Sequence, residues 1–242
     1  VTVCTAIDRS DRAIESCLAY LREVGTDWPA HPPCALVEQE YKRLREAIGD
    51  RSIASLAALP AIGDPDSRAT LDVLAAALPP AFFSDRHLVC LILCRMANLS
   101  LQHGASDASA LGFAYLGMVA GPYFGDYAAG YDFGRLGFDL AERHGRTRYR
   151  ARVLMTFAYH VVPWTRDVRS ERPLLLRAFE EARECGDVTY GGFTSVTLVT
   201  SMLAAGDPLA TVQRTAEARL AYVRQVRFGL CAAILTTQLQ ML

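Results

Sequence analysis

The chain has 242 residues, of which 51% are hydrophobic and 21% charged, and its formal net charge is −1. This composition predicts a globular protein, because disordered chains combine low hydrophobicity with high net charge. The near-neutral charge argues against a general binder of nucleic acid or membrane surfaces, since both tasks need a basic excess. The longest apolar run, residues 88–94, is far shorter than the roughly 20 residues that cross a bilayer, so we expect a cytoplasmic location.

The amino-terminal part, residues 1–63, is predicted to hold irregular leading helices. A helix is expected from Arg12 to Val24, where Gly25 ends it, and a second from about Ala35 to Ile48. The turn-rich stretch TDWPAHPP at 26–33 separates them. Because the chain begins at Val1 rather than at Met and stops inside an apolar stretch, we expect it to be an excised piece of a longer polypeptide.

From residue 64 onward a pattern returns at a fixed 41-residue offset. FDLAERHG at 138–145 and FEEARECG at 179–186 share an aromatic residue, an alanine three places on and a closing glycine. Aspartate caps the free amide groups of a first helical turn, and a terminal glycine adopts the left-handed cap. At this offset helices are opened by Asp85, Asp126 and Asp167 and closed by Gly104, Gly145 and Gly186.

The period predicts repeated units of two amphipathic helices each. Their boundaries are 64–104, 105–145, 146–186 and 187–227, followed by a partial unit at 228–242. No strand-like alternation of useful length occurs in the sequence. We therefore predict an all-α fold in which the helix pairs stack as a right-handed α-solenoid.

The spacings F138xxA141 and F179xxA182 resemble the tetratricopeptide pattern, although the 41-residue period is longer than that of the family. More specifically, residues 17–31, 68–85, 94–118, 121–140 and 160–165 resemble the helical region of large bacterial multidomain proteins. In those proteins a serine/threonine-kinase-like domain and a predicted AAA/STAND-type ATPase precede the helical region, and a GAF domain and a sensor histidine kinase follow it. The resemblance implies a signalling protein and brings no catalytic residue into this segment.

Catalytic and metal-binding motifs are absent from the sequence. It has no GxxxxGK[ST] phosphate loop, no GxSxG elbow and no HExxH pair. Cys90 and Cys94 are one helical turn apart but lack partners at zinc spacing, and the seven scattered cysteines are expected to be buried free thiols. We therefore expect no enzyme activity in this segment, no metal and no cofactor.

The histidines are interpreted as structural residues. His103 and His144 each precede a terminal glycine, where a cation suits the helix dipole. His160, in a helix that Pro163 and Trp164 end, is expected to be a hydrogen-bonded structural residue, as buried polar groups usually are.

A stripe on the first helices of the units is the candidate binding surface. At the 41-residue offset, three positions of one helix correspond to positions in its two neighbours. The candidate residues are Tyr115, Met118, Arg152, Thr156, Tyr159, Thr197 and Thr200. If they form a recognition surface they should be partly exposed, with Arg152 as the specificity element and Tyr115 and Tyr159 as aromatic anchors. The alternative is that the stripe is part of an extended core.

Three functions remain open on the sequence alone. The first is an interaction module that connects or regulates an ATPase and a histidine kinase, with flanking domains of the same polypeptide or another protein as partners. The second is a sensor that binds a small ligand in a concave groove. The third, an all-α enzyme, needs convergent titratable groups that the sequence does not reveal. Nucleic acid and membranes are not expected as partners.

Overall fold

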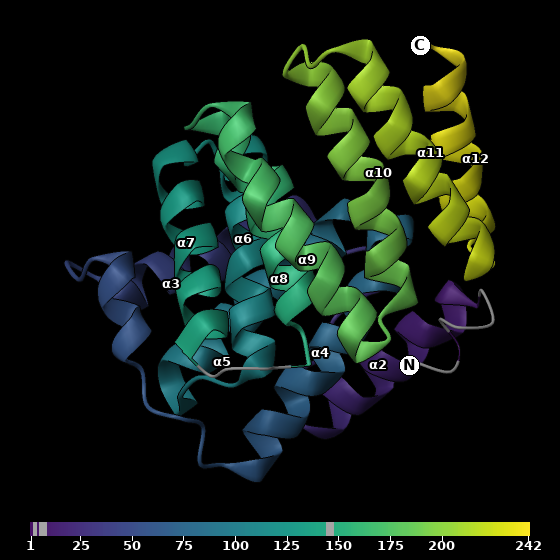
Figure 1. Ribbon diagram of the computed structural model, residues 1–242. Coiled ribbons are helices and arrows are strands. Elements are labelled where there is room, and N and C mark those ends of the chain that lie inside the picture. Colours follow the sequence, from purple (N-terminus) through teal and green to yellow (C-terminus); the bar gives the residue numbers. More distant parts are fainter. Residues whose placement is uncertain (2–3, 5–8, 144–147) are drawn as a thin grey trace. The chain divides into compact units, whose positions relative to one another are not determined.

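The computed structural model describes residues 1, 4, 9–143 and 148–242. These residues form helices and no β-strand (Figure 1), and an isolated bridge links Ala61 to Ala105. The prediction of an all-α fold is confirmed for this part of the chain. The chain divides into two compact units, Val1–His144 and Gly145–Leu242, which are described separately. The predicted boundary between residues 63 and 64 lies inside the first unit.

The first unit begins with the leading helices close to their predicted bounds. Its described elements are α2 (Ser10–Glu23), α3 (Cys34–Ile48), the 3-10 helix η1 (Ile53–Ala58), α4 (Pro65–Ser84), α5 (Arg86–His103), α6 (Asp107–Phe124) and α7 (Tyr127–Arg143). Helices two apart in the chain touch: α2 contacts α4, α3 contacts α5, and α4 contacts α6. Stacked helix pairs give this pattern, because each pair packs mainly on its neighbours.

The second unit has a less regular beginning and a regular end. Its described elements are α8 (Arg150–Met155), the π-helix η2 (Thr156–Val161), the 3-10 helices η3 (Val162–Trp164) and η4 (Val168–Glu171), α9 (Arg172–Cys185), α10 (Val188–Ala204), α11 (Leu209–Gln225) and α12 (Gly229–Gln240). Here α8 contacts α9 and α10, and α10 contacts α11 and α12.

Each of the four predicted repeat units holds two α-helices, and α12 occupies the partial unit. Contacts between helices two apart occur in both compact units. The right-handed superhelix and the 41-residue period stay predictions. Gly145 and His144, on which one of the predicted helix ends rests, lie outside the described residues.

The predicted helix caps are formed at two of three positions as the sequence indicated. Asp85 accepts hydrogen bonds from the amides of His87 (2.7 Å) and Leu88 (3.1 Å), and Asp126 accepts one from Ala129 (3.1 Å). These two N-caps are confirmed.

The third predicted cap begins a different kind of turn. Asp167 accepts from the amide of Arg169 at 2.7 Å, but it starts the short 3-10 helix η4, and α9 begins only at Arg172. Pro173 in the first turn of α9 suits that start, because the amides there have no partner inside the helix. Gly186 adopts the predicted left-handed cap, with φ 74° and ψ 19°. Gly104 also has a positive φ of 105°, but its ψ of 171° lies outside the left-handed region, so the predicted cap is wrong there.

Two glycines of the first unit allow α6 and α7 to approach closely. A Cβ atom built on Gly137 would lie 2.5 Å from the amide nitrogen of Ala114, and one on Gly117 would lie 2.6 Å from that of Gly134. Next to this contact the rings of Phe113 and Phe133 stack with their centroids 6.3 Å apart. Helix α6 is therefore buried over most of its length.

All seven cysteines are free thiols, but the prediction that they are buried is wrong for Cys34 and Cys185, which are exposed, and for Cys4, which is partly exposed. Cys34 stands at the first residue of α3 and Cys185 at the last of α9, where a helix is least covered by its neighbours. Inside the helix pairs, burial raises the pKa of Cys90 to about 12. That thiol therefore stays protonated and unreactive at neutral pH.

Candidate interaction surface

The candidate residues Tyr115 and Met118 belong to α6 in the first unit. Tyr115 is buried, with 5% of its surface exposed, and its ring lies 5.2 Å from that of Phe82. The expectation of an exposed anchor at Tyr115 is therefore wrong, because α6 packs against α4, α5 and α7. Met118, one turn further on, is partly exposed.

In the second unit, Arg152, Thr156 and Tyr159 lie on α8 and the π-helix that continues it. Thr156 is fully buried, and its hydroxyl has no hydrogen-bond partner among the described residues, so the expectation that it is exposed is wrong. It stands where the α-helix widens into the π-helix. Tyr159 is partly exposed, and its ring meets that of His160 edge-on at 5.0 Å.

Arg152 is already engaged within the unit. Its Nε lies 2.8 Å from Oδ2 of Asp187, and its guanidinium lies 4.7 Å from the ring centre of Tyr190. The expected carboxylate partner of this side chain is therefore intramolecular. Arg152 ties α8 to the first turn of α10, where Asp187 also caps the amide of Tyr190 at 3.1 Å. Arg152 is partly exposed, as expected, and its ion pair gives it a structural role, while its role as a specificity element stays a prediction.

Thr197 and Thr200 lie on α10 and are both partly exposed. The hydroxyl of Thr197 donates to the carbonyl of Thr194 at 3.2 Å. Thr200 donates to the carbonyl of Val196 at 3.1 Å and accepts from Nε2 of Gln238 at 2.9 Å. Thr200 therefore connects α10 to α12, a contact that sequence reasoning missed because the two residues are far apart in the chain.

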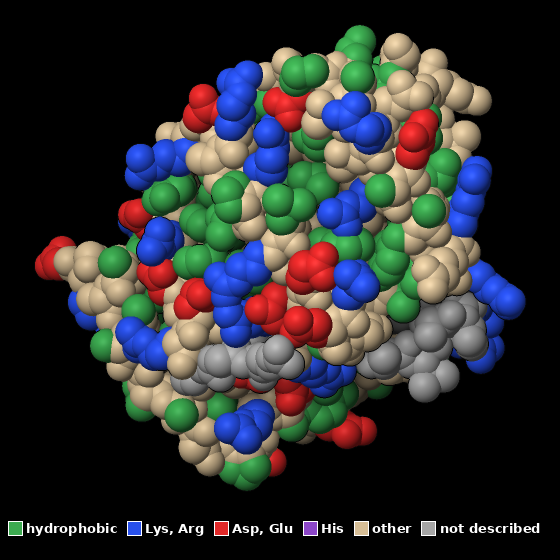
Figure 2. Space-filling model, in the orientation of Figure 1, with side chains coloured by type: hydrophobic (Ala, Val, Ile, Leu, Met, Phe, Trp, Pro, Cys, Tyr) green, Lys and Arg blue, Asp and Glu red, His purple; other side chains and the backbone are tan. Residues whose placement is uncertain are grey.

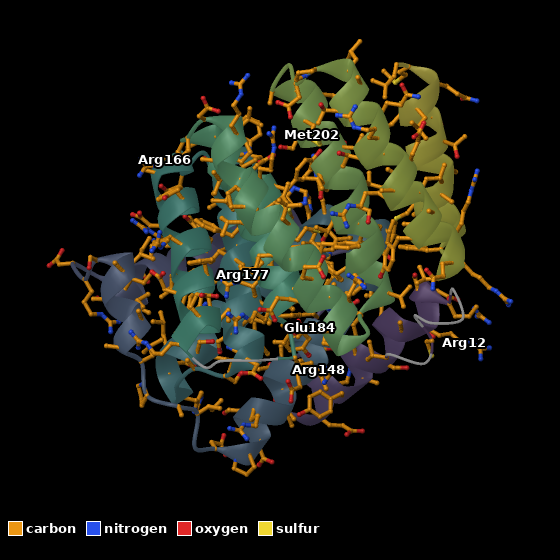
Figure 3. The ribbon with its side chains drawn as sticks, viewed as in Figure 1. Arg12, Arg148, Arg166, Arg177, Glu184 and Met202 are labelled. Carbon is orange, nitrogen blue, oxygen red and sulfur yellow. The ribbon has the colours of Figure 1, made fainter. Side chains whose placement is uncertain are left out.

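Further ion pairs join successive helices of the second unit. Arg150 on α8 lies 3.2 Å from Glu181 on α9. Arg172, the first residue of α9, lies 2.7 Å from Asp207, which stands just before α11. On the visible face, Figure 2 shows Lys and Arg side chains interspersed with Asp and Glu, and Figure 3 shows Arg177 and Glu184 along α9. Charges of both signs are thus mixed on this face.

Contacts between two pairs of positions recur at the 41-residue offset. Arg152 pairs with Asp187, and at the equivalent positions of the next unit the ring of Phe193 meets that of Phe228 at 5.6 Å. Arg150 pairs with Glu181, and at the equivalent positions Gly191 lies against the hydroxyl of Tyr222. Corresponding residues thus meet in successive helix pairs although the chemistry of the contact changes.

His160 and Glu171 are two titratable groups of the second unit; His160 is partly exposed and Glu171 is buried. Burial lowers the pKa of His160 to about 4. Glu171 is 1% exposed and lies near the hydroxyl of Ser201 and the guanidinium of Arg172. Burial raises the pKa of Glu171, and the hydrogen bond from Ser201 and the positive charge of Arg172 lower it by less. Neither group shifts the pKa of the other.

An apolar crevice in the first unit is lined by Ile14, Cys17, Leu18, Leu21, Trp28, Leu88 and Ile92, and it is too narrow to admit a water molecule. No group of three or more His, Cys, Asp or Glu side chains in the described parts of the chain could hold a metal ion. None of the helices there combines the length and apolar character needed to cross a membrane.

Sequence reasoning also missed an apolar face at the end of the second unit. Leu230, Ile234 and Met241 are exposed along α12 and the residue after it. The sequence already indicated this face, because these residues stand 41 positions after residues of α10.

Comparison with known proteins gives one distant relative of signalling character. Over 160 residues, which are 65% of this chain, the sequence is 25% identical to the hybrid signal transduction histidine kinase G of Dictyostelium discoideum. The chain spans about 5% of the length of that protein, so the kinase in its name concerns a much longer polypeptide. No family model matches the chain. No solved structure matches it either.

Proposed function

We propose that this chain is a helical-repeat interaction module of a histidine-kinase signalling protein and is not itself an enzyme. The observation that carries the proposal is the similarity to 5% of a hybrid histidine kinase, in a segment whose described residues form paired helices. Stacked helix pairs offer extended surfaces for binding other protein segments. The tetratricopeptide-like class, the neighbouring ATPase and the cytoplasmic location belong to the same proposal.

The small-ligand alternative has less support than the interaction module. A sensor of this kind needs a concave, mostly apolar pocket, and the crevice beside Trp28 is closed to water. The enzyme alternative gains no support from His160, because burial accounts for its lowered pKa.

Tyr159 provides the test of the interaction module, because it is partly exposed and aromatic anchors carry much of the energy of protein interfaces. The purified chain is mixed with the kinase region of the signalling protein that contains it, and binding is measured by calorimetry. We expect Tyr159→Ala to weaken binding by about 1–3 kcal/mol while changing the unfolding midpoint little.

Two control variants separate binding from folding. Gln213→Ala changes an exposed residue of α11 and should leave binding unchanged. Arg152→Ala should lower the stability of the chain, because it leaves Asp187 without its ion-pair partner. Absence of binding by the unmodified chain, or equal loss with Gln213→Ala, contradicts the proposal.

A further inference from the structure

Helix α12 has one covered face and one uncovered face. Cys231, Leu235 and Gln238 are buried, and Gln238 donates from Nε2 to Thr200 of α10. The opposite side of the helix carries no charge, because residues 229–242 contain no Asp, Glu, Lys, Arg or His. We call this exposed side the α12 outer face; it consists of Leu230, Ala233, Ile234, Thr237 and Met241.

The positions of α10 that stand 41 residues before this face are covered by α12 and by Phe228, which precedes it. A Cβ on Gly192 would meet the ring of Phe228 and lie 3.1 Å from Sγ of Cys231. Phe193 meets Phe228, and the carbonyl of Val196 and the hydroxyl of Thr200 accept from Gln238. Adding 41 to the numbers of these four α10 residues gives Ala233, Ile234, Thr237 and Met241. The positions through which α10 holds α12 are therefore exposed at the equivalent places on α12.

We propose that the α12 outer face is the docking surface for a further helix pair built like α11 and α12. The inference concerns how helices stack and does not depend on the proposed signalling role. A further pair is favoured over a second copy of α12, because α8 and α10 are each covered by the two helices that follow them (Figure 1). The docked pair would continue an interface that the chain already forms.

The residues of the outer face define one feature of the partner. In the α8–α10 contact Ala151 occupies the position equivalent to Gly192, 41 residues earlier, and Asp187 pairs with the neighbouring Arg152. In the α10–α12 contact glycine makes room for the large Phe228. On α12 the equivalent position holds Ala233, and the apolar Ile234 stands beside it. The partner should therefore carry a small uncharged residue at the position equivalent to Phe228.

The test extends the full chain by a helix pair of known sequence. A second copy of residues 202–242 is appended directly after Leu242, because Leu242 has the register of Ser201. The copy carries Phe228→Ala to leave space for Ala233. We expect the extended chain to be monomeric, to unfold at a higher midpoint, and to exchange the amides of α12 at least about tenfold more slowly, since local stability sets that rate.

Charge on the outer face provides the matched comparison. Ile234→Glu should leave the midpoint of the 242-residue chain unchanged, since the residue is exposed, and should remove the stabilisation in the extended chain. Leu176→Glu, at another exposed apolar residue on α9, should leave that stabilisation intact. An appended pair that stays unfolded, or that folds without slowing exchange in α12, overturns the proposal. So does a dimer of the 242-residue chain that Ile234→Glu dissociates, because the occupant is then a second copy.

Discussion

Glu171 is a single residue whose environment opposes its charge. It ends η4 inside the second unit and is 1% exposed, so its ionised carboxylate is removed from solvent, and a hydrogen bond from Ser201 offsets only part of that cost. Burying a carboxylate without full compensation by its neighbours costs stability. Its raised pKa in the folded state means that the folded chain binds the proton more tightly than the unfolded chain does.

We predict that Glu171→Gln stabilises the chain above the pH at which the unfolded residue ionises. For a carboxyl whose folded pKa is raised, stability falls as pH rises from the unfolded pKa through the folded one, and it stays lower above both. The variant removes this loss, so it should gain about 1–3 kcal/mol at pH 8 and much less at pH 4. Urea unfolding at both pH values measures the difference.

Glu180→Gln serves as the comparison for Glu171→Gln. Glu180 is exposed and pairs with Arg183 at 2.9 Å, and exposed pairs contribute at most about 1 kcal/mol. A gain for Glu171→Gln that is equal at pH 4 and pH 8 would mean that ionisation of the buried carboxylate is not its cause.

Single residues also show where sequence reasoning reaches its limit. Asp85 and Asp126 were predictable as caps because their partners are two or three residues away. Arg152 was predicted to offer its guanidinium to the carboxylate of a partner, and its ion pair with Asp187 was missed because that residue is 35 residues distant. A sequence shows that an arginine is available for pairing, but the packing of remote helices decides which carboxylate it meets.

Among the elements, α6 shows how helix packing decides exposure. The stripe that includes Tyr115 was correctly placed on a helix, but whether it faces solvent depends on how closely other helices approach. The glycines of the α6–α7 contact bring the two backbones together, and Tyr115 ends up beside Phe82. The short periodic pattern of α8 likewise gave no sign that the helix would widen at Thr156.

We predict that Gly137→Ala destabilises the first unit. The new methyl group would lie 2.5 Å from the amide nitrogen of Ala114 and 2.6 Å from the carbonyl of Ala110, both backbone atoms of α6. Such overpacking costs about 1–3 kcal/mol, which is comparable to or larger than the gain of up to about 1 kcal/mol that alanine has over glycine in a helix. Chemical denaturation should show a net loss.

Gly63→Ala is the control for this variant in the same unit. A Cβ at Gly63 meets nothing within 4 Å, so its effect should be neutral or slightly stabilising through the unfolded chain. If Gly137→Ala is as stable as the unmodified chain, α6 and α7 do not approach as closely as the structure indicates.

At the scale of the whole molecule, composition and periodicity were informative because they average over many residues. The absence of strand-like alternation correctly indicated an all-α fold for the described residues. The superhelix that the 41-residue period predicts has an energetic consequence that can be measured. In a stack of helix pairs stability is approximately a sum of local and nearest-neighbour contributions, so damage to one interface should stay near it.

Gly192→Ala damages one such interface. The new methyl group would meet the ring of Phe228 and lie 3.1 Å from the Sγ of Cys231, both of which pack on α10. We predict faster hydrogen exchange in α10, α11 and α12 and unchanged exchange in α2 to α5, measured peptide by peptide by mass spectrometry under native conditions. In contrast, a fold that opens as one cooperative block would exchange faster in every helix. Uniform acceleration from α2 to α12 would therefore count against the solenoid, whereas a graded response confined to the last helices supports it.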